Sequence, residues 1–234
     1  MRGTTVAAAL LAAGVCAGLT ATAGSSGPAP ATTTAFTATA TAAASGPNWP
    51  EFNQNPARTG VAAGSPAAGA LSTAWTARLD GAVYGQPLVV GHEVIAATEN
   101  DSLYALNRAS GKLVWRKHVG TPVAQRDLHG CGDIFPLGIT GTPAYDSGNG
   151  LVYAVAELAG YHHMLVGLDA ATGAVKLHRY IDVATVANQR AYNQQRPALT
   201  LAHGRVYVAM GGLDGDCGPY QGSVVSAPVT GNGP

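Results

Sequence analysis

The sequence contains an internal repeat, and this repeat restricts the fold more than any other feature of the chain. The segment Leu103–Gly111, LYALNRASG, aligns without a gap with LVGLDAATG, Leu165–Gly173, at an offset of 62 residues. A run rich in β-branched residues precedes each copy, at Val94–Thr98 and at Leu151–Val155. Self-similarity of this kind is typical of proteins that stack one structural unit many times. The middle of the chain is therefore predicted to consist of consecutive copies of one unit.

Each unit is predicted to be a small antiparallel sheet. An apolar segment led by proline opens it, as in Pro87–Val90 and Pro143–Tyr145, and a glycine-containing turn leads into the β-branched run. A third run of this type is Arg205–Ala209. The segments are short and alternate in polarity, as strands do, and no long window keeps a helical period. Four strands in a repeat of this length are typical of a propeller blade, so we predict an all-β fold, a partial β-propeller of four-stranded antiparallel blades.

The turn before the fourth strand uses the same side-chain types in both copies. An Asn or Asp side chain can accept backbone N–H groups, and a Ser or Thr can add a weaker bond of the same kind. A glycine can take the positive φ that closes the turn. A tryptophan on the outer strand that follows can fill the gap to the next blade. These predicted turn residues are Asn107, Ser110, Gly111 and Trp115 in the first copy, and Asp169, Thr172 and Gly173 in the second.

With these turns, Leu103–Trp115 resembles the signature of the PQQ-like (quinoprotein-type) β-propeller repeat proteins. Gly167–Gly173 is a second copy, although Leu177 stands where the signature has tryptophan. The resemblance covers about residues 75 to 229 and implies a ring of about seven or eight blades. Proteins of this kind include alcohol and sugar dehydrogenases, outer-membrane assembly scaffolds and many secreted proteins, so the resemblance specifies the fold more narrowly than the activity.

The repeats account for only about three blades of such a ring. Two are complete, Gln86–Val119 and Gly141–Asp182, whereas a third, Gln195–Val229, lacks a clear outer strand. Leu71–Leu79, which contains Trp75, resembles one outer strand of an additional blade. An unclosed arc leaves strand edges without partners. We expect a truncated product or fragment, and the alternative is self-association through the open blade edges.

The N-terminus has the pattern of a secretory signal peptide, predicted over residues 1–23. Arg2 precedes the uncharged apolar run Val6–Leu19, and Ala21 and Ala23 provide the small residues of a cleavage site. The run is too short and too rich in small residues for a transmembrane helix, so no membrane span is expected after signal removal. Val15 before Cys16 argues against lipoprotein anchoring. We expect the protein to be secreted.

Two segments follow the predicted signal peptide. Residues 24–47 consist almost entirely of small residues and proline, so they are predicted to be a disordered linker, and residues 48–234 the partial propeller domain. Charged residues make up 11% of the chain, and 13 Lys and Arg balance 13 Asp and Glu. This balance argues against nucleic acid as a partner, because such binding needs a basic surface.

Two cysteines, Cys131 and Cys217, remain after the predicted signal. An even number in a secreted protein indicates one disulfide, and this pair would connect loops of successive blades. The alternative is two free thiols. Neither His129 beside Cys131 nor the adjacent pair His162 and His163 has the spacing of a metal site, and we expect His162 and His163 to be surface or loop histidines. The Asp214-Gly-Asp216 turn lacks the other ligands of a calcium loop.

The sequence favours a non-catalytic role. In the family, quinone-dependent dehydrogenases carry adjacent cysteines, a stacked tryptophan and an acidic calcium site, and this sequence contains no such set. We therefore assign no catalytic or cofactor-binding residue and expect no cofactor. The favoured function is a secreted binding or scaffold module that uses loops Asp127–Ile134 and Leu213–Gln221 to contact a protein or carbohydrate ligand. The alternative is the remnant of a quinoprotein alcohol or sugar dehydrogenase, with PQQ and calcium as its cofactors.

Overall fold

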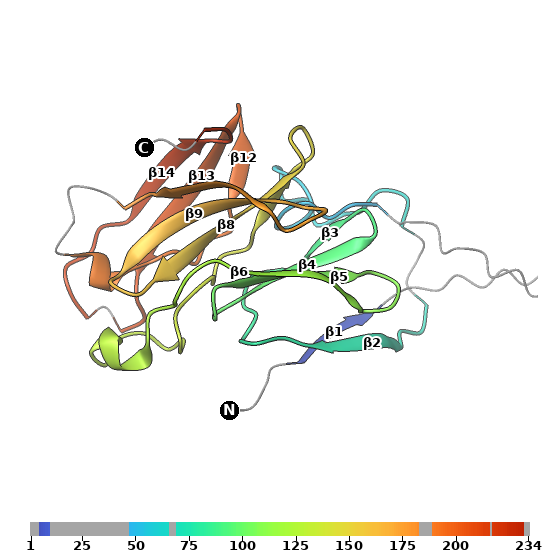
Figure 1. Cartoon of the computed structure of the whole chain (residues 1–234). Helices are drawn as coiled ribbons and strands as arrows, with labels where there is room; N and C mark the ends of the chain where they lie inside the picture. Colours follow the sequence, from blue (N-terminus) through green and yellow to red (C-terminus); the bar gives the residue numbers. More distant parts are fainter. Residues whose placement is uncertain (1–4, 10–46, 66–68, 183–188, 216, 232–234) are drawn as a thin grey trace, which may run out of the picture.

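The computed structural model describes residues 5–9, 47–65, 69–182, 189–215 and 217–231. It contains three four-stranded antiparallel sheets, which we number as blades (Figure 1). Blade 1 consists of β3 (Leu88–Val90), β4 (Glu93–Thr98), β5 (Ser102–Asn107) and β6 (Leu113–His118). Blade 2 consists of β7 (Ala144–Asp146), β8 (Leu151–Leu158), β9 (His162–Asp169) and β10 (Val175–Tyr180). The all-β fold predicted from the repeat is confirmed.

Blade 3 has a different strand arrangement. Its strands are β11 (Asn193–Gln194), β12 (Thr200–Ala202), β13 (Arg205–Gly212) and β14 (Ser223–Pro228). The strand β13 pairs with all three others, and β11 pairs only with the last two residues of β13, Gly211 and Gly212. In the described part of the chain, no strand follows β14 on the outside of this blade, where β6 and β10 lie in the other two.

The blades converge at their first strands, as in a propeller. The inner strand β7 contacts both β3 and β12, while β6 and β10 form the outer edges of their blades. Separate apolar clusters fill the spaces between neighbouring blades. One joins blades 1 and 2 through residues such as Leu103 and Val166, and another joins blades 2 and 3 through residues such as Leu165 and Val206. The alternation of side chains along each strand therefore buries both faces of blade 2.

The tryptophan positions of the repeat connect successive blades. The Trp115 ring packs on Gly173 of blade 2, and its Nε1–H donates to the carbonyl oxygen of Ala170 at 2.7 Å. In the same way, Trp75 packs on Gly111 of blade 1 and donates to the carbonyl oxygen of Arg108 at 2.8 Å. Because the ring occupies the space of a Cβ, only glycine fits at these turns. The outer strand of one blade is thus fixed to the turn of the next.

The contact between blades 2 and 3 uses other side chains. Leu177 occupies the tryptophan position and is buried. Two residues further along β10, the Arg179 guanidinium donates to the carbonyl oxygens of Thr230, at 3.2 Å, and Gly231. An arginine therefore provides the hydrogen bonds to the next turn that an indole provides elsewhere.

Two further strands precede blade 1. The strand β2 (Thr73–Arg78) carries Trp75 and covers one face of blade 1. It pairs antiparallel with β1 (Thr5–Ala9), which falls within the predicted signal peptide. Residues 10–46, which include nearly all of the predicted linker, lie outside the described part of the chain. No helix in the described residues is long and apolar enough to cross a membrane.

Residues 48–58, which we call the inner strap, run along the inner strands of all three blades. Trp49 forms a two-way backbone bridge with Val89 of β3, at 2.7 and 3.0 Å. The carbonyl oxygen of Pro50 accepts from the N–H of Tyr145 on β7 at 2.7 Å. Arg58 donates to the Thr200 hydroxyl of β12 at 2.6 Å. The inner strap therefore satisfies backbone and side-chain groups on the edges that would face the channel of a closed ring.

Candidate functional site

The loops that follow the second and fourth strands of the blades gather at one end of the molecule, which we call the loop face. The connector between blades 1 and 2 contributes the 3-10 helix η1 (Gln125–Leu128), and the hairpin between β13 and β14 contributes residues 213–222 (Figure 1). A small apolar cluster packs these two loops together. Its buried members are Val123, Leu128, Cys131, Ile134, Leu137 and Leu213. Loops packed in this way present their outer side chains in a fixed arrangement.

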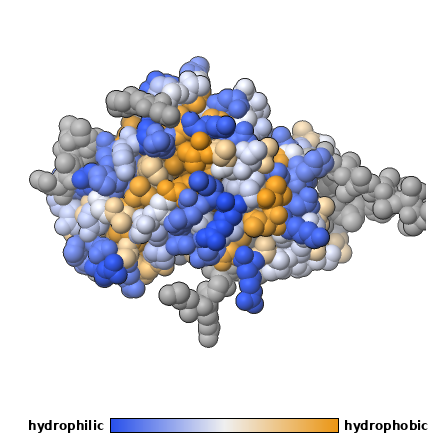
Figure 2. All heavy atoms as spheres, in the orientation of Figure 1, coloured by the Kyte–Doolittle hydropathy of each residue, from blue (hydrophilic) through white to orange (hydrophobic). Residues whose placement is uncertain are grey.

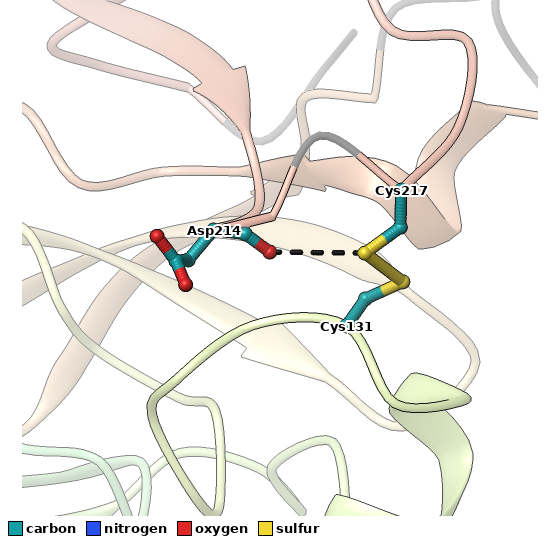
Figure 3. Close-up of a disulfide and its surroundings, with 3 residues drawn as sticks. All are labelled: Cys131, Asp214 and Cys217. Carbon is teal, nitrogen blue, oxygen red and sulfur yellow. Dashed lines mark hydrogen bonds between the residues drawn. A yellow bond between two sulfur atoms is a disulfide. The ribbon is translucent and has the colours of Figure 1, made fainter.

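A disulfide between Cys131 and Cys217 joins the two loops (Figure 3). The bond therefore connects the entrance of blade 2 with blade 3, across 86 residues of sequence. The carbonyl oxygen of Asp214 lies 3.8 Å from the Cys217 sulfur and accepts from the backbone N–H of Gly132 at 3.0 Å. Of the two alternatives left open by the sequence, the structure contains the disulfide.

The loop face exposes aromatic side chains. Phe135 is 44% exposed and Tyr220 is 37% exposed, and they lie on the two loops that the disulfide joins. Away from the loop face, on the side of the molecule seen in Figure 2, apolar residues also reach the surface between polar ones. Aromatic residues are enriched in protein interfaces, so their exposure on fixed loops is typical of a contact surface.

A histidine lies between two carboxylates beneath this face. The His163 side chain is only 2% exposed. Its Nε2 lies 2.7 Å from Glu157 Oε1, and its Nδ1 lies 3.2 Å from Asp182 Oδ1. Burial alone would lower the pKa of His163, but its bonds to the two carboxylates outweigh burial and raise the pKa to about 9. An imidazolium held on both sides is suited to binding blade 2 to its connector rather than to moving a proton.

The adjacent His162 contacts the same carboxylate. Its Nδ1 lies 2.7 Å from Asp182 Oδ2, and Arg190 Nη1 lies 3.3 Å from that oxygen. Burial opposes ionisation of Asp182, but the hydrogen bonds from His163 and His162 hold its pKa well below the usual range. The sequence interpretation of this histidine pair as surface or loop residues is wrong for His163. Alternation along a strand separates the two rings, yet Asp182 reaches both because it follows the neighbouring strand.

Two further carboxyl groups, those of Glu99 and Asp101, lie near Glu157 between blades 1 and 2. Glu99, Asp101 and Glu157 are each at most 3% exposed. Glu99 accepts from the backbone N–H of Gly138 at 2.8 Å and from the Thr140 hydroxyl at 3.2 Å. Neither oxygen of Asp101 has a hydrogen-bond partner within the structure. Burial raises the pKa of Glu99 to about 7, and burial together with the charges of Glu157 and Glu99 raises that of Asp101 to about 9.

The sequence reasoning did not identify this cluster, although a signal for it exists. In the strand registers Glu93 pairs with Asn107, and Leu151 pairs with Asp169. Counting forward by six residues from the first member of each pair places Glu99 and Glu157 at the same position of the repeat. A glutamate at the same place in two blades, at the end of an apolar strand, could have been found by aligning the second strands.

One small cavity lies beside Glu157 and His163. Its volume is about 10 Å³, enough for about one water molecule. Val123, Leu137, Glu157, His163 and Arg190 are among its lining residues. Among the described residues, no group of three or more His, Cys, Asp and Glu side chains is placed to bind a metal ion. Asp216 of the Asp214-Gly-Asp216 turn lies outside the described residues.

The predicted turn residues lie at the opposite ends of the strands from the loop face. Asn107 Oδ1 accepts from the backbone N–H of Ser110 at 3.0 Å, and Asp169 Oδ1 accepts from that of Thr172 at 2.9 Å. Hydrogen bonds from Thr172 lower the pKa of Asp169. These side chains build the turns on which the tryptophans pack, and they do not contribute to the loop face.

The comparison with known proteins identifies one matching family and several similar structures. Residues 57–215, well over half of the chain, match the model of the family described as outer membrane protein assembly factor BamB. No curated protein matches the chain. The structure of BamB from Moraxella catarrhalis is 18% identical with a TM-score of 0.45, covering 68% of this chain and 44% of that protein.

Two similar structures are oxidoreductases. A europium-containing methanol dehydrogenase is 24% identical with a TM-score of 0.47, covering 65% of this chain and 24% of that enzyme. The quinohemoprotein alcohol dehydrogenase from Comamonas testosteroni is 21% identical with a TM-score of 0.39, covering 60% and 25%. The chain thus spans less than half the length of each of these proteins.

Proposed function

This chain belongs to the PQQ-like β-propeller family described as outer membrane protein assembly factor BamB, and on that basis we propose that it is a secreted, non-catalytic module that binds a protein ligand through its loop face. The family description names an assembly factor, a role that rests on contact with other proteins. The apolar run and small residues at the N-terminus support export. The disulfide supports an oxidising compartment, where such bonds persist.

The observation that carries this proposal is the contrast between the two candidate surfaces. The inner strap already bonds to β3, β7 and β12, so the chain itself occupies their channel-side edges. The loop face instead presents Phe135 and Tyr220 on loops fixed by a disulfide and an apolar cluster. Fixed aromatic side chains bind with little loss of conformational entropy, which favours this face as the contact surface.

Site-specific photo-cross-linking tests the location of the contact. A photoreactive phenylalanine analogue replaces Phe135, 44% exposed on the loop face, or Val114, 47% exposed near the opposite end of β6. In cells that secrete the protein, we expect one reproducible protein adduct from position 135 and none from position 114. The protein identified in the adduct is then purified and its affinity is measured. It should bind the Phe135→Ser variant more weakly than the wild type, and the Val114→Ser variant as tightly as the wild type.

The same pair of positions can reject the proposal. Adducts of equal yield from both positions, or a partner whose affinity Phe135→Ser leaves unchanged, would contradict a loop-face contact. Binding to a glycan array that is lost in Phe135→Ser would assign the face to carbohydrate instead of protein.

A separate assay tests the non-catalytic part of the proposal. Purified protein is incubated with PQQ and calcium, and oxidation of alcohols and sugars is followed with an electron-accepting dye. We expect no oxidation above a control without protein. Turnover that depends on the quinone would favour the dehydrogenase alternative.

A further inference from the structure

Glu99 and Glu157, which occupy the same position of the repeat, make equivalent contacts in successive blades. Each lies at the end of the second strand of its blade, Glu99 directly after β4 and Glu157 near the end of β8, and accepts a backbone N–H from the connector that enters the next blade. Glu99 binds the N–H of Gly138 at 2.8 Å, and Glu157 binds that of Gln195 at 3.1 Å. The repeat therefore contains a carboxyl contact that fixes where each following blade begins.

The two contacts differ in the charge that surrounds them. Glu157 lies 2.7 Å from His163, which provides a positive charge. Among the described residues, no cationic side chain forms an ion pair with Glu99. The positive charge of Arg196 lowers the pKa of Glu99, but Arg196 itself forms an ion pair with Asp133 at 4.0 Å. Glu99 instead faces two further carboxyl groups, those of Asp101 and Glu157.

Asp101 makes this arrangement sensitive to ionisation. The residue is fully buried, and neither of its carboxyl oxygens has a hydrogen-bond partner among the residues that the structure describes. Its Oδ1 would lie only 2.8 Å from a Cβ at Gly138, so the carboxyl group is adjacent to the connector that Glu99 holds. A carboxylate without partners in such a place costs several kcal/mol, and a neutral carboxyl group costs much less. The charged groups that face Asp101 are Glu99 and Glu157, and both would repel it.

We propose that Glu99, Asp101 and Glu157 form a proton-controlled latch between blade 1 and the connector to blade 2. The latch is closed while Asp101 is protonated. When Asp101 loses its proton, repulsion among the three carboxylates and hydration of Asp101 separate the connector around Gly138 from Glu99. The equivalent contact of blade 2 stays closed over the same range, because His163 Nε2 lies 2.7 Å from Glu157 and a neutral imidazole can still donate a hydrogen bond there after the ring loses its charge.

Hydrogen exchange of the full-length protein, resolved to single amides, tests the latch without any substitution. Protection factors of the Gly138 and Gln195 amides are compared from pH 6 to pH 10 after correction for intrinsic exchange. We expect the protection of Gly138 to fall at least about tenfold more than that of Gln195, since each pH unit above the pKa changes the protonated fraction tenfold. Equal pH dependence at the two amides would overturn the proposal.

Substitutions assign the effect to Asp101. In Asp101→Asn, which cannot ionise, protection of Gly138 should no longer depend on pH, whereas Asp214→Asn, at an exposed carboxyl group, should behave as the wild type. Glu99→Gln is the second variant if Asp101→Asn does not fold, because it keeps an acceptor for Gly138 and removes one charge. Full pH dependence in both Asp101→Asn and Glu99→Gln would contradict the latch.

Discussion

Substitution of Gly173 by alanine tests whether the turn and the tryptophan hold the blades together. A Cβ at this position would lie 2.7 Å from Cδ2 of Trp115, far inside the normal contact distance. Gly150 is the matched control, because its φ of +73° is nearly the same as the +71° of Gly173 and nothing lies within 4 Å of its Cβ position. Both alanines incur the cost of a left-handed conformation, but only one displaces the indole.

The structure gives the expected size of the difference. A left-handed conformation costs a residue with a Cβ about 1–2 kcal/mol, which is the expected loss for Gly150→Ala. Displacing Trp115 also breaks its 2.7 Å hydrogen bond to Ala170 and leaves a buried carbonyl unpaired, a further cost of about 1–3 kcal/mol. Gly173→Ala should therefore destabilise the protein by about 2–5 kcal/mol.

Urea unfolding measures both variants against the wild type. The midpoint should shift much further for Gly173→Ala than for Gly150→Ala, with an unchanged slope for each because the surface exposed on unfolding stays the same. Trp115 fluorescence should shift to the red only in Gly173→Ala. Equal losses of stability in the two variants would refute the claim that the Trp115 contact joins the blades.

Three other predictions follow from the interblade contacts. Replacing both Cys131 and Cys217 by serine should lower the stability by up to about 4–5 kcal/mol in urea unfolding, because the bond closes a long loop; no loss would contradict a stabilising cross-link. Arg179→Met should lower the free energy of unfolding by about 1–3 kcal/mol in the same assay, since the carbonyl oxygens of Thr230 and Gly231 lose the Arg179 donor. An unchanged stability would contradict a role of Arg179 in joining blades 2 and 3. His163 has a folded pKa of about 9 against 6.5 unfolded, so the stability from its charge is complete below pH 6.5 and is lost as the pH rises to 9. The stability difference between wild type and His163→Asn should narrow by about 3 kcal/mol over that range, and a constant difference would argue against a charged His163.

The blades were predictable because their signals are local. The β-branched runs, the glycine turns and Trp115 each lie within a few residues of the strand that they define. The third unit, in which the sequence shows no clear outer strand, also has none after β14 in the described residues. Physical requirements of short segments, such as positive φ at Gly111, leave a readable pattern.

The contacts between distant segments were not predictable in the same way. The inner strap depends on Trp49 and Arg58 reaching strands that lie about 40 and 140 residues away, and no short pattern encodes such pairs. Leu177 was recognised as a departure from the repeat, but nothing indicated that Arg179 would provide the missing hydrogen bonds. Compensation of this kind depends on the geometry of the neighbouring turn.

The candidate site was predicted in part. The loops that contain Cys131 and Cys217 were identified from their composition, and the structure joins them. The carboxyl groups of Glu99 and Asp101 were missed, because charged residues are usually exposed and their burial follows from the stacking of two blades. His163 was misjudged for the same reason.

Nuclear magnetic resonance of the labelled protein tests the stacking of the blades most directly. The face of an indole ring shifts nearby α-proton resonances upfield, and the Trp75 and Trp115 rings lie against Gly111 and Gly173. We predict strongly upfield-shifted α protons at these two glycines, with nuclear Overhauser contacts to the two rings, and ordinary shifts at Gly150. Ordinary shifts at Gly111 and Gly173, with no contact to either indole, would contradict the stacked blades.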